Sequence, residues 1–429
     1  MSVEAALADF AHGPLEGAGD ARALMRLCLF DWAACGLAGR GEPVAVKLRD
    51  WAADTCGSGP ATLFGGGHAA PESAALVNGA TSHALDYDDT HFAHIGHTSV
   101  AVLPAALAVA EAVGGTLDDV IDAALVGSEG AVRTGVWLGR DHYQVGFHQT
   151  ATSGTFGAAL AAMRIGGLDV PEMMHGLGLA ATQASGLKSQ FGTMGKPLNA
   201  GLAAEAGVRA AAWARRGMTS ARRGIGGPQG FGPTHHGAGD LAAFDGMGSD
   251  WRILGISHKF HACCHGLHAM LEALADRAAA PDALSEIVVT THPRWLTVCN
   301  VPAPQTALEC KFSYRLTAAM ALSGVDTAAI GNFSAATAQR PDLIALRDKV
   351  EVVGDDALSE MQTRVELRHA DGRREVLSAD LDAPLSLTAR EERLRGKAAA
   401  LLGEELAEAL WSAVQGEALG PLTFLMRAP

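Results

Sequence analysis

The chain has 429 residues, 48% of them hydrophobic, and a formal net charge of −14. This length exceeds what one ordinary hydrophobic core supports, so two domains are expected. The negative charge argues against nucleic acid and anionic membranes as partners. The longest apolar run, residues 100–110, is too short to span a bilayer.

Cysteine usage and the N-terminal segment bear on the cellular compartment. The seven cysteines show no paired spacing, and their odd count predicts reduced thiols and a cytoplasmic location. Residues 1–13 lack a basic stretch followed by an apolar one, so we predict no signal peptide.

Helical periodicity dominates the first 220 residues. The predicted helices are 23–39, 71–90, 99–113, 116–138, 153–165, 170–186 and 197–216. A glycine-rich segment then covers residues 217–250, and it is interpreted as either a mobile lid or a linker.

The pattern changes after residue 250. Alternating, β-rich runs occupy 285–298, 349–354 and 363–381, and helices are predicted at 265–279, 306–322 and 325–338. An Ala-Asp-Gly turn inside the third run predicts a hairpin and an antiparallel sheet. The sequence therefore predicts a mainly α protein. A large helical domain would comprise residues 1–255 and 385–429, and a smaller α+β domain residues 256–384.

The segment HALDYDDTHFAHIGH, residues 83–97, carries four histidines and three aspartates in fifteen positions. On a helix, His83, Asp86 and Thr90 would share one stripe. Burying such a stripe costs free energy unless its groups are paired or used, so this segment is the first candidate active site. Three interpretations remain open: a metal site, a metal-free acid–base site, or a polar helix end in which Asp88 and Asp89 cap backbone groups.

A second histidine-rich segment is HKFHACCHGLH, residues 258–268. Its spacing matches no standard zinc motif, and buried thiols are the favoured interpretation of the adjacent cysteines. Lys259, one of only seven lysines, is a candidate anion-binding group. The zinc interpretation would use His261, Cys263, Cys264, His265 and His268.

A third candidate lies at 189–201, where Lys196 follows a glycine turn and Pro197 is expected to open a helix. Backbone N–H groups at a helix N-terminus and the Lys196 ammonium would together attract an anion, for which a carboxylate suffices. His148 precedes another predicted helix, where it is either structural or catalytic. Tyr314 lies on a mostly apolar helix, so its phenol needs a partner.

Six short motifs, in this order, resemble the MmgE/PrpD family, also called the 2-methylcitrate dehydratase family, which includes cis-aconitate decarboxylases and iminodisuccinate epimerases. They are NGATSHALDYDDTH, GH at 96–97, GFH at 146–148, GTMGKPLNAG at 192–201, KFHACCHG at 259–266 and FSY at 312–314. The resemblance implies a helical domain, a smaller lid domain, a cleft between them, a homodimer, and no metal or organic cofactor. It places in the cleft Asp86, Thr90, His97, His148, Lys196, Lys259 and Tyr314.

The resemblance also implies roles. His148 is the first choice for general acid or base, with Asp86 orienting a histidine or acting as a second base. His97 would bind a carboxylate or carry a proton. Lys196 and Lys259, with Thr90, would bind the carboxylates of a small anionic substrate, and Tyr314 would donate a hydrogen bond from the lid.

The implied activity is a cofactor-independent lyase that removes a proton beside a carboxylate of a small di- or tricarboxylic acid, in a dehydration or a decarboxylation. The first alternative is an epimerase of an iminodisuccinate-like dicarboxylate. The second alternative is a metal-dependent hydrolase. The sequence departs from the family pattern at Asn199, where a histidine is frequent.

Overall fold

The computed structural model describes residues 2–428 and divides them into two compact units. The first unit runs to His258 and resumes at Leu402, and the second comprises Lys259–Leu401. The sequence-based boundaries were 255 and 385. The larger difference arises because helix α16 (Leu387–Leu402) groups with the second unit.

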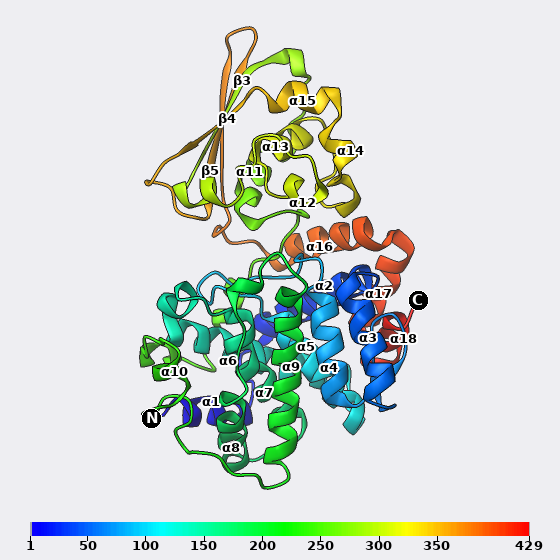
Figure 1. Ribbon diagram of the computed structural model, residues 1–429, viewed down its shortest axis with the longest axis vertical. Helices are drawn as coiled ribbons and strands as arrows, with labels where there is room; N and C mark the ends of the chain where they lie inside the picture. The colour runs from blue at the N-terminus through cyan, green and yellow to red at the C-terminus, as the bar shows by residue number, and fades with distance from the viewer. Residues whose placement is uncertain (1, 429) are drawn as a thin grey trace. The chain divides into compact units, whose positions relative to one another are not determined.

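The first unit is a helical bundle (Figure 1). Helix α9 packs along both α4 and α7, and α7 also packs against α5 and α6. A two-stranded hairpin of β1 (Ala61–Thr62) and β2 (His68–Ala69) is its only sheet among the described residues. Its helices are α1 (Val3–His12), α2 (Gly19–Gly39), α3 (Pro43–Thr55), α4 (Pro71–Ser82), α5 (Ser99–Val113), α6 (Leu117–Gln144), α7 (Gln149–Ile165), α8 (Val170–Ala181), α9 (Gly195–Ala214), α10 (Phe231–Thr234), α17 (Glu404–Gln415) and α18 (Leu419–Met426).

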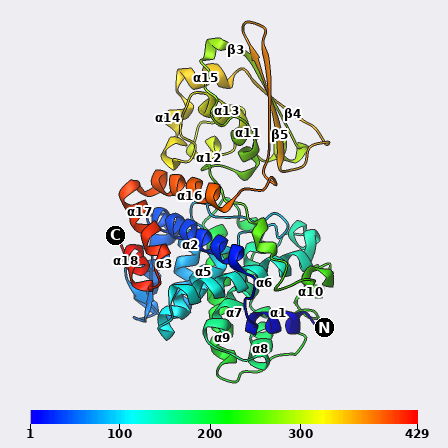
Figure 2. The same ribbon diagram turned by 180° about the vertical axis from the view of Figure 1, so that it is seen from behind.

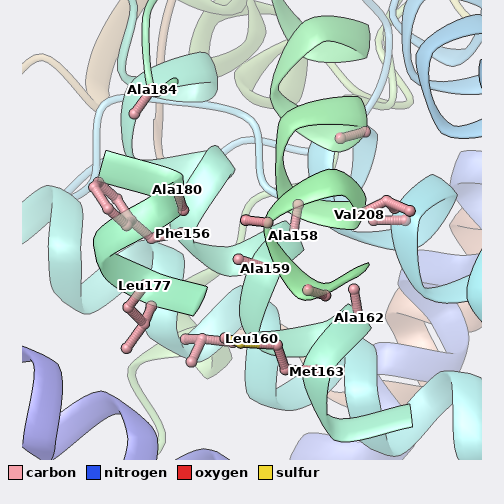
Figure 3. Close-up of a cluster of buried hydrophobic side chains, with 14 of the residues drawn as sticks. Phe156, Ala158, Ala159, Leu160, Ala162, Met163, Leu177, Ala180, Ala184 and Val208 are labelled. Atoms are coloured by element: carbon pink, nitrogen blue, oxygen red, sulfur yellow. The ribbon is translucent and has the colours of Figure 1, made fainter. Parts of the chain in front are cut away.

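Small residues let these helices approach closely. A Cβ at Gly79 of α4 would lie 2.9 Å from the Cα of Gly201 in α9, and a Cβ at Gly201 would lie 2.3 Å from the Leu76 carbonyl oxygen. In the core around α7, Phe156 and Leu160 lie among alanines of the same and neighbouring helices (Figure 3). Close packing of this kind fixes where each helix ends, and so positions the loops that follow.

The prediction of a helix over 71–90 was wrong in its second half. Helix α4 ends at Ser82, and Asp86 has a φ of 51°, a left-handed conformation that ends helical geometry. Residues 83–97 are held in place by tertiary contacts rather than as part of one helical stripe. Thr90, for example, exchanges two backbone hydrogen bonds with Ser257, at 2.8 and 2.7 Å.

The glycine-rich segment 217–250 is neither a lid nor a simple linker. Phe231 and Phe244 are buried in the core of the first unit. The guanidinium of Arg133, on α6, donates to the carbonyls of Ala243 and Asp245, at 2.9 and 2.7 Å. The segment is therefore a packed, non-repetitive part of the bundle.

The second unit contains a four-stranded sheet in the order β4-β3-β5-β6. Helices α11 (His268–Ala273) and α13 (Tyr314–Leu322) pack against that sheet, on the same side of it in both views (Figures 1 and 2). The predicted hairpin is present, with Gly372 at φ +86° in its turn. Its elements are β3 (Leu284–Thr291), β4 (Val350–Gly354), β5 (Gln362–His369), β6 (Arg374–Asp380), α11 (His268–Ala273), α12 (Ala307–Cys310), α13 (Tyr314–Leu322), α14 (Ala335–Ala338), α15 (Pro341–Arg347) and α16.

The sheet is mixed rather than antiparallel as predicted. Strand β4 runs parallel to β3, while β3–β5 and β5–β6 are antiparallel. The parallel pair is possible because residues 292–349, which include several short helices, join β3 to β4 and are long enough for a crossover.

No helix among the described residues is long and apolar enough to cross a membrane. The seven cysteines are all free thiols. The cytoplasmic location stays a prediction.

Candidate active site

The candidate site of the first unit lies around the N-terminus of α7, where three chain segments meet. His148 is the residue that precedes the helix, and its backbone N–H donates to the Gly186 carbonyl at 3.0 Å. The backbone N–H of His97 donates to Thr150 Oγ1 of the same helix at 3.0 Å. Gly186 has a φ of +136°, and a Cβ there would lie 2.6 Å from the Ala151 Cβ. These contacts bring residues 83–97, 146–148 and 186–199 together.

Asp88 connects two of the histidines. Its Oδ1 lies 2.8 Å from His83 Nδ1, and its Oδ2 lies 2.7 Å from His97 Nδ1. The Asp88 side chain is completely buried. The two rings lie against each other with centroids 4.6 Å apart, and the His83 ring stacks at 6.3 Å on that of His148. Three imidazoles and one carboxylate thus form a single buried cluster.

The ammonium of Lys196 is paired with Asp86. Lys196 Nζ lies 2.6 Å from Asp86 Oδ1, and the same oxygen lies 3.5 Å from His97 Nε2. The Asp86 side chain is 44% exposed, whereas that of Lys196 is 17% exposed. Lys196 is the second residue of α9, which begins at Gly195. The predicted Pro197 opening of this helix was therefore two residues late, but the lysine does lie at the helix N-terminus.

Asn199 orients His148. The Asn199 side-chain amide lies 3.2 Å from His148 Nδ1, and it also donates to the Leu187 carbonyl at 3.3 Å. On its other side, the His148 ring meets the edge of the Phe191 ring at 4.9 Å. Phe191 also lies 5.4 Å from the Lys196 ammonium. An apolar ring therefore separates the imidazole and the ammonium from part of the solvent.

Burial determines the charge state of these histidines. Burial lowers the pKa of His97 to about 4, although the adjacent Asp88 opposes the shift. Burial, with the neighbouring His83 and Lys196, lowers the pKa of His148 well below its ordinary value. Burial would raise the pKa of Asp88, but its contacts with His83 and His97 outweigh burial and hold that pKa well below its ordinary value. At neutral pH, His97 and His148 are thus neutral and Asp88 is ionised.

Two predicted binding groups lie in other settings. The Thr90 hydroxyl donates to the Ser257 carbonyl at 3.3 Å, which fastens the 83–97 segment to the end of the first unit. Lys259 is the first residue of the second unit. Tyr314 also belongs to the second unit. Its hydroxyl donates to the Gly266 carbonyl at 2.6 Å and lies 3.0 Å from Thr291 Oγ1, so the phenol has the partners that its burial requires.

The four residues Asp86, His97, His148 and Lys196 are therefore brought together by the first unit. The sequence analysis missed His83, Asp88 and Asn199 as members of the cluster. His83 was noticed only as part of a helical stripe, and Asp88 was assigned to capping. Asp89 does fit the capping interpretation, since it accepts the backbone N–H of Ser99 at the start of α5.

The second histidine-rich segment forms a network of its own within the second unit. His261 Nδ1 lies 2.6 Å from Thr327 Oγ1, and its Nε2 lies 3.1 Å from Glu272 Oε1. Glu272 is also bound by Arg393, whose guanidinium stacks over the Phe260 ring at 3.8 Å. Burial raises the pKa of Cys263 beyond the range in which a thiolate forms. Buried thiols, rather than zinc ligands, agree with these contacts.

Two groups of side chains among the described residues have ligand atoms close enough to hold a metal ion. One is part of the cluster above, and the other lies beside it. In each group, the ligand atoms lie within 4.8 Å of one another. The groups are His83, Asp86, Asp88 and His97, and Cys28, Asp89 and His258.

The fold and the cluster define a helical enzyme-like unit in which an ammonium and neutral imidazoles surround a carboxylate, with no nucleotide-binding motif. Comparison with known proteins agrees with this class. The MmgE/PrpD N-terminal domain matches residues 5–243, and the MmgE/PrpD C-terminal domain matches residues 261–411. The chain belongs to the MmgE/PrpD family.

Three curated relatives of the chain are named after the same activity. A cis-aconitate decarboxylase of Aspergillus terreus is 32% identical over 57% of this chain and 54% of its own length. A cis-aconitate decarboxylase-like protein of Aspergillus oryzae is 31% identical over 57% and 55%. The human cis-aconitate decarboxylase is 27% identical over 84% and 80%. The chain thus matches about half the length of the two fungal relatives.

Proposed function

We propose that this protein is a cofactor-independent lyase of the 2-methylcitrate dehydratase type, acting on a small di- or tricarboxylic acid. Family membership and the names of the relatives support a reaction on a polycarboxylate. The reaction would be a dehydration or a decarboxylation. An epimerase acting on an iminodisuccinate-like dicarboxylate is the alternative, because it requires the same proton transfer beside a carboxylate.

One observation carries the proposal. The Asp86 carboxylate lies 2.6 Å from the Lys196 ammonium and 3.5 Å from His97 Nε2. The site thus already holds a carboxylate of the protein between an ammonium and an imidazole. A substrate carboxylate that displaced Asp86 would meet the same two groups, with its neighbouring carbon beside the imidazoles.

The chemistry follows from charge. In a dehydration, a base removes the proton beside the carboxylate, the electron pair forms the C=C bond, and the departing hydroxyl leaves as water with one proton. In a decarboxylation, the C–C bond to the carboxylate breaks, CO2 leaves, and the resulting carbanion takes one proton. Both reactions pass negative charge to carboxylate oxygens, which an ammonium in a partly buried site stabilises.

The remaining assignments are also proposals. Lys259 would supply a second ammonium for the substrate, and Thr90 would contribute by fastening the 83–97 segment. The homodimer rests on the family resemblance and is tested by the mass of the protein in solution. Tyr314 has its only O–H donated to Gly266, so we expect its substitution to affect stability more than turnover.

The metal-dependent hydrolase is supported less well. The group His83, Asp86, Asp88 and His97 has the donor types of a metal site. However, Asp88 already pairs with both ring Nδ1 atoms, and Lys196 already pairs with Asp86. An ion bound by these four residues would have to displace the ion pairs of Asp88 and Asp86.

The test is an NMR screen in deuterium oxide of untagged protein with cis-aconitate, citrate, 2-methylcitrate and iminodisuccinate. New alkene signals with release of CO2 indicate decarboxylation, and new alkene signals without CO2 indicate dehydration. Deuterium exchange with a change of optical rotation and no alkene indicates the epimerase. Binding without any exchange or product contradicts the proposal. Stoichiometric zinc, with activity lost to a chelator, would establish the metal-dependent alternative.

A further inference from the structure

The two central imidazoles of the site, His97 and His148, have different partners on their Nδ1 atoms. For His97 the partner is the Asp88 carboxylate, 2.7 Å away. An ionised carboxylate only accepts hydrogen bonds. The angle of this contact does not make a regular hydrogen bond. An Nδ1 lone pair at 2.7 Å would nevertheless be repelled by the ionised oxygen, so the hydrogen of the neutral ring is favoured on Nδ1 and the lone pair on Nε2.

His148 has the opposite partner. The Asn199 amide lies between His148 Nδ1 and the Leu187 carbonyl, and its Nδ2 is within 3.2 and 3.3 Å of the two. The Leu187 carbonyl can only accept, so it fixes the NH2 group of the amide on this side. The second hydrogen of that NH2 group is then donated to His148 Nδ1. A neutral His148 therefore carries its hydrogen on Nε2.

The two arrangements respond differently to a second proton. A proton on His97 Nε2 produces an imidazolium with Asp88 at 2.7 Å on one nitrogen and Asp86 at 3.5 Å on the other. Both carboxylates stabilise that cation. A proton on His148 Nδ1 would instead point at the hydrogens of Asn199, and Lys196 lies close enough to oppose the charge. His148 is thus held neutral.

We infer that His97 is the proton-transfer residue of the site and that His148 is a fixed N–H donor, with Asp88 and Asn199 as the positioning residues that assign these roles. This inference rests on the proposed function and deepens it. In a dehydration, His97 Nε2 accepts the proton from the substrate carbon and passes it to the departing hydroxyl, which leaves as water. In an epimerisation, His97 Nε2 accepts that proton and solvent returns one to the other face of the carbon. In a decarboxylation, the neutral His97 first takes a proton from solvent on Nε2 and delivers it to the carbon as CO2 leaves. His148 donates its Nε2 hydrogen to a substrate oxygen and transfers no proton.

His83 completes the arrangement around Asp88. Its Nδ1 lies 2.8 Å from Asp88 Oδ1, so the carboxylate is held from both sides and cannot rotate away from His97. The Nε2 of His83 is buried and has no hydrogen-bond partner among the described residues. His83 is therefore a third positioning residue, which acts on His97 through Asp88.

The first experiment reads the tautomers directly and needs no substrate. Long-range 15N–1H correlation spectra separate Nδ1–H from Nε2–H imidazoles, and the variants His97→Gln and His148→Gln assign the two rings among the 17 histidines. We expect Nδ1–H for His97 and Nε2–H for His148 near neutral pH. In Asn199→Asp, the new carboxylate accepts from Nδ1, so the His148 tautomer should reverse. Any other assignment in the wild-type protein overturns the inference, whether or not a substrate is known.

The second experiment uses the same matched pair of variants with the acid that the wild-type protein turns over. Glutamine retains an N–H donor but is not a base. We expect His97→Gln to lose about 10²- to 10⁴-fold in the rate of solvent deuterium exchange at carbon, with a smaller loss in His148→Gln. Asp88→Asn should lower kcat with little change in KM. If Asp88→Asn does not fold, the inference is still tested by the His148 tautomer in Asn199→Asp and by the relative exchange rates of His97→Gln and His148→Gln. A larger loss in His148→Gln than in His97→Gln overturns the inference, whereas an inactive wild-type protein counts against the proposed function alone.

Discussion

The two histidine-rich segments, 83–97 and 258–268, look alike in the sequence but differ in how their side chains are satisfied. In the first, His83 and His97 share one buried carboxylate, Asp88. In the second, His261 contacts a threonine and a glutamate that is itself bound by Arg393. The first network has a partly exposed member, Asp86, which is bound by an ammonium. The second is closed by an arginine stacked on an aromatic ring.

The comparison teaches that the number of histidines in a segment does not indicate a site. The two networks differ in whether a charged side chain can still bind a ligand. The first network ends in the Lys196–Asp86 pair, whose aspartate side chain is 44% exposed, and we propose that a substrate carboxylate displaces Asp86 there. In the second, Arg393 pairs with Glu272, so we expect His261, Glu272 and Arg393 to stabilise the fold of the second unit, while Lys259 of the same segment stays the candidate binding group.

The largest expected effect tests the first network. Replacing Lys196 with alanine removes the cation that pairs with Asp86, and kcat/KM should fall by about 10²- to 10³-fold, because stabilisation of the developing negative charge is lost. His148→Ala should also cause a severe loss. Steady-state kinetics on the acid identified by the NMR screen measure both. Lys188→Ala is the matched control, since Lys188 lies eight residues earlier and donates to the Tyr143 carbonyl at 3.1 Å. Full activity in Lys196→Ala, with the fold intact, would break the comparison.

A smaller effect on kinetics is expected for Lys259, the candidate binding residue of the second unit. If Lys259 binds a substrate carboxylate, Lys259→Ala should raise KM about tenfold and change kcat less, which corresponds to about 1.4 kcal/mol of binding free energy. The matched control is Lys311→Ala in the same unit. Equal KM values for the two variants and the wild-type protein would remove Lys259 from the site.

A further prediction concerns stability rather than turnover, and it tests the structural character of the second network through the pH dependence of unfolding. Burial would raise the pKa of Glu272, but hydrogen bonds from His261 and Arg393 outweigh it and lower that pKa to about 2. A carboxyl whose pKa is lower in the folded state stabilises the fold above its ordinary pKa of 4.5, and this contribution is lost as the pH falls toward 2. We expect a loss of about 3 kcal/mol in the free energy of unfolding over that range.

The control for this prediction is Glu272→Gln, whose unfolding free energy should depend less on pH between those values in denaturant titrations. His261→Asn should likewise lower stability while kcat stays close to the wild-type value. A selective loss of turnover in His261→Asn, without a change in stability, would show that the second segment takes part in catalysis.

Much of the fold could be predicted from the sequence because hydrophobic periodicity is local. Helix α5 and the hairpin of β5 and β6 were predicted nearly to the residue. The parallel pairing of β4 was not, because pairing of distant strands leaves no signal in either strand alone. The end of α4 at Ser82 was also missed, since it depends on tertiary contacts of the residues that follow.

The membership of the site could be predicted only in part. The family-like motifs indicated four site residues that the first unit brings together: Asp86, His97, His148 and Lys196. Their partners could not be found in the same way. Asn199 lies 51 positions from His148, and an amide near a helix start is usually a surface group. Its effect on His148 arises only when the chain has folded.

The pairing of Asp86 with Lys196 has a consequence for selectivity. A carboxylate tethered to the same chain competes with every incoming anion at a high effective concentration. A single acetate or chloride ion offers no more charge than Asp86 already provides, so we expect such ions to bind weakly. An acid with several carboxylates can offset the displacement of Asp86 through its additional charges. We therefore expect the Asp86–Lys196 pair to favour acids with several carboxylates over singly charged anions.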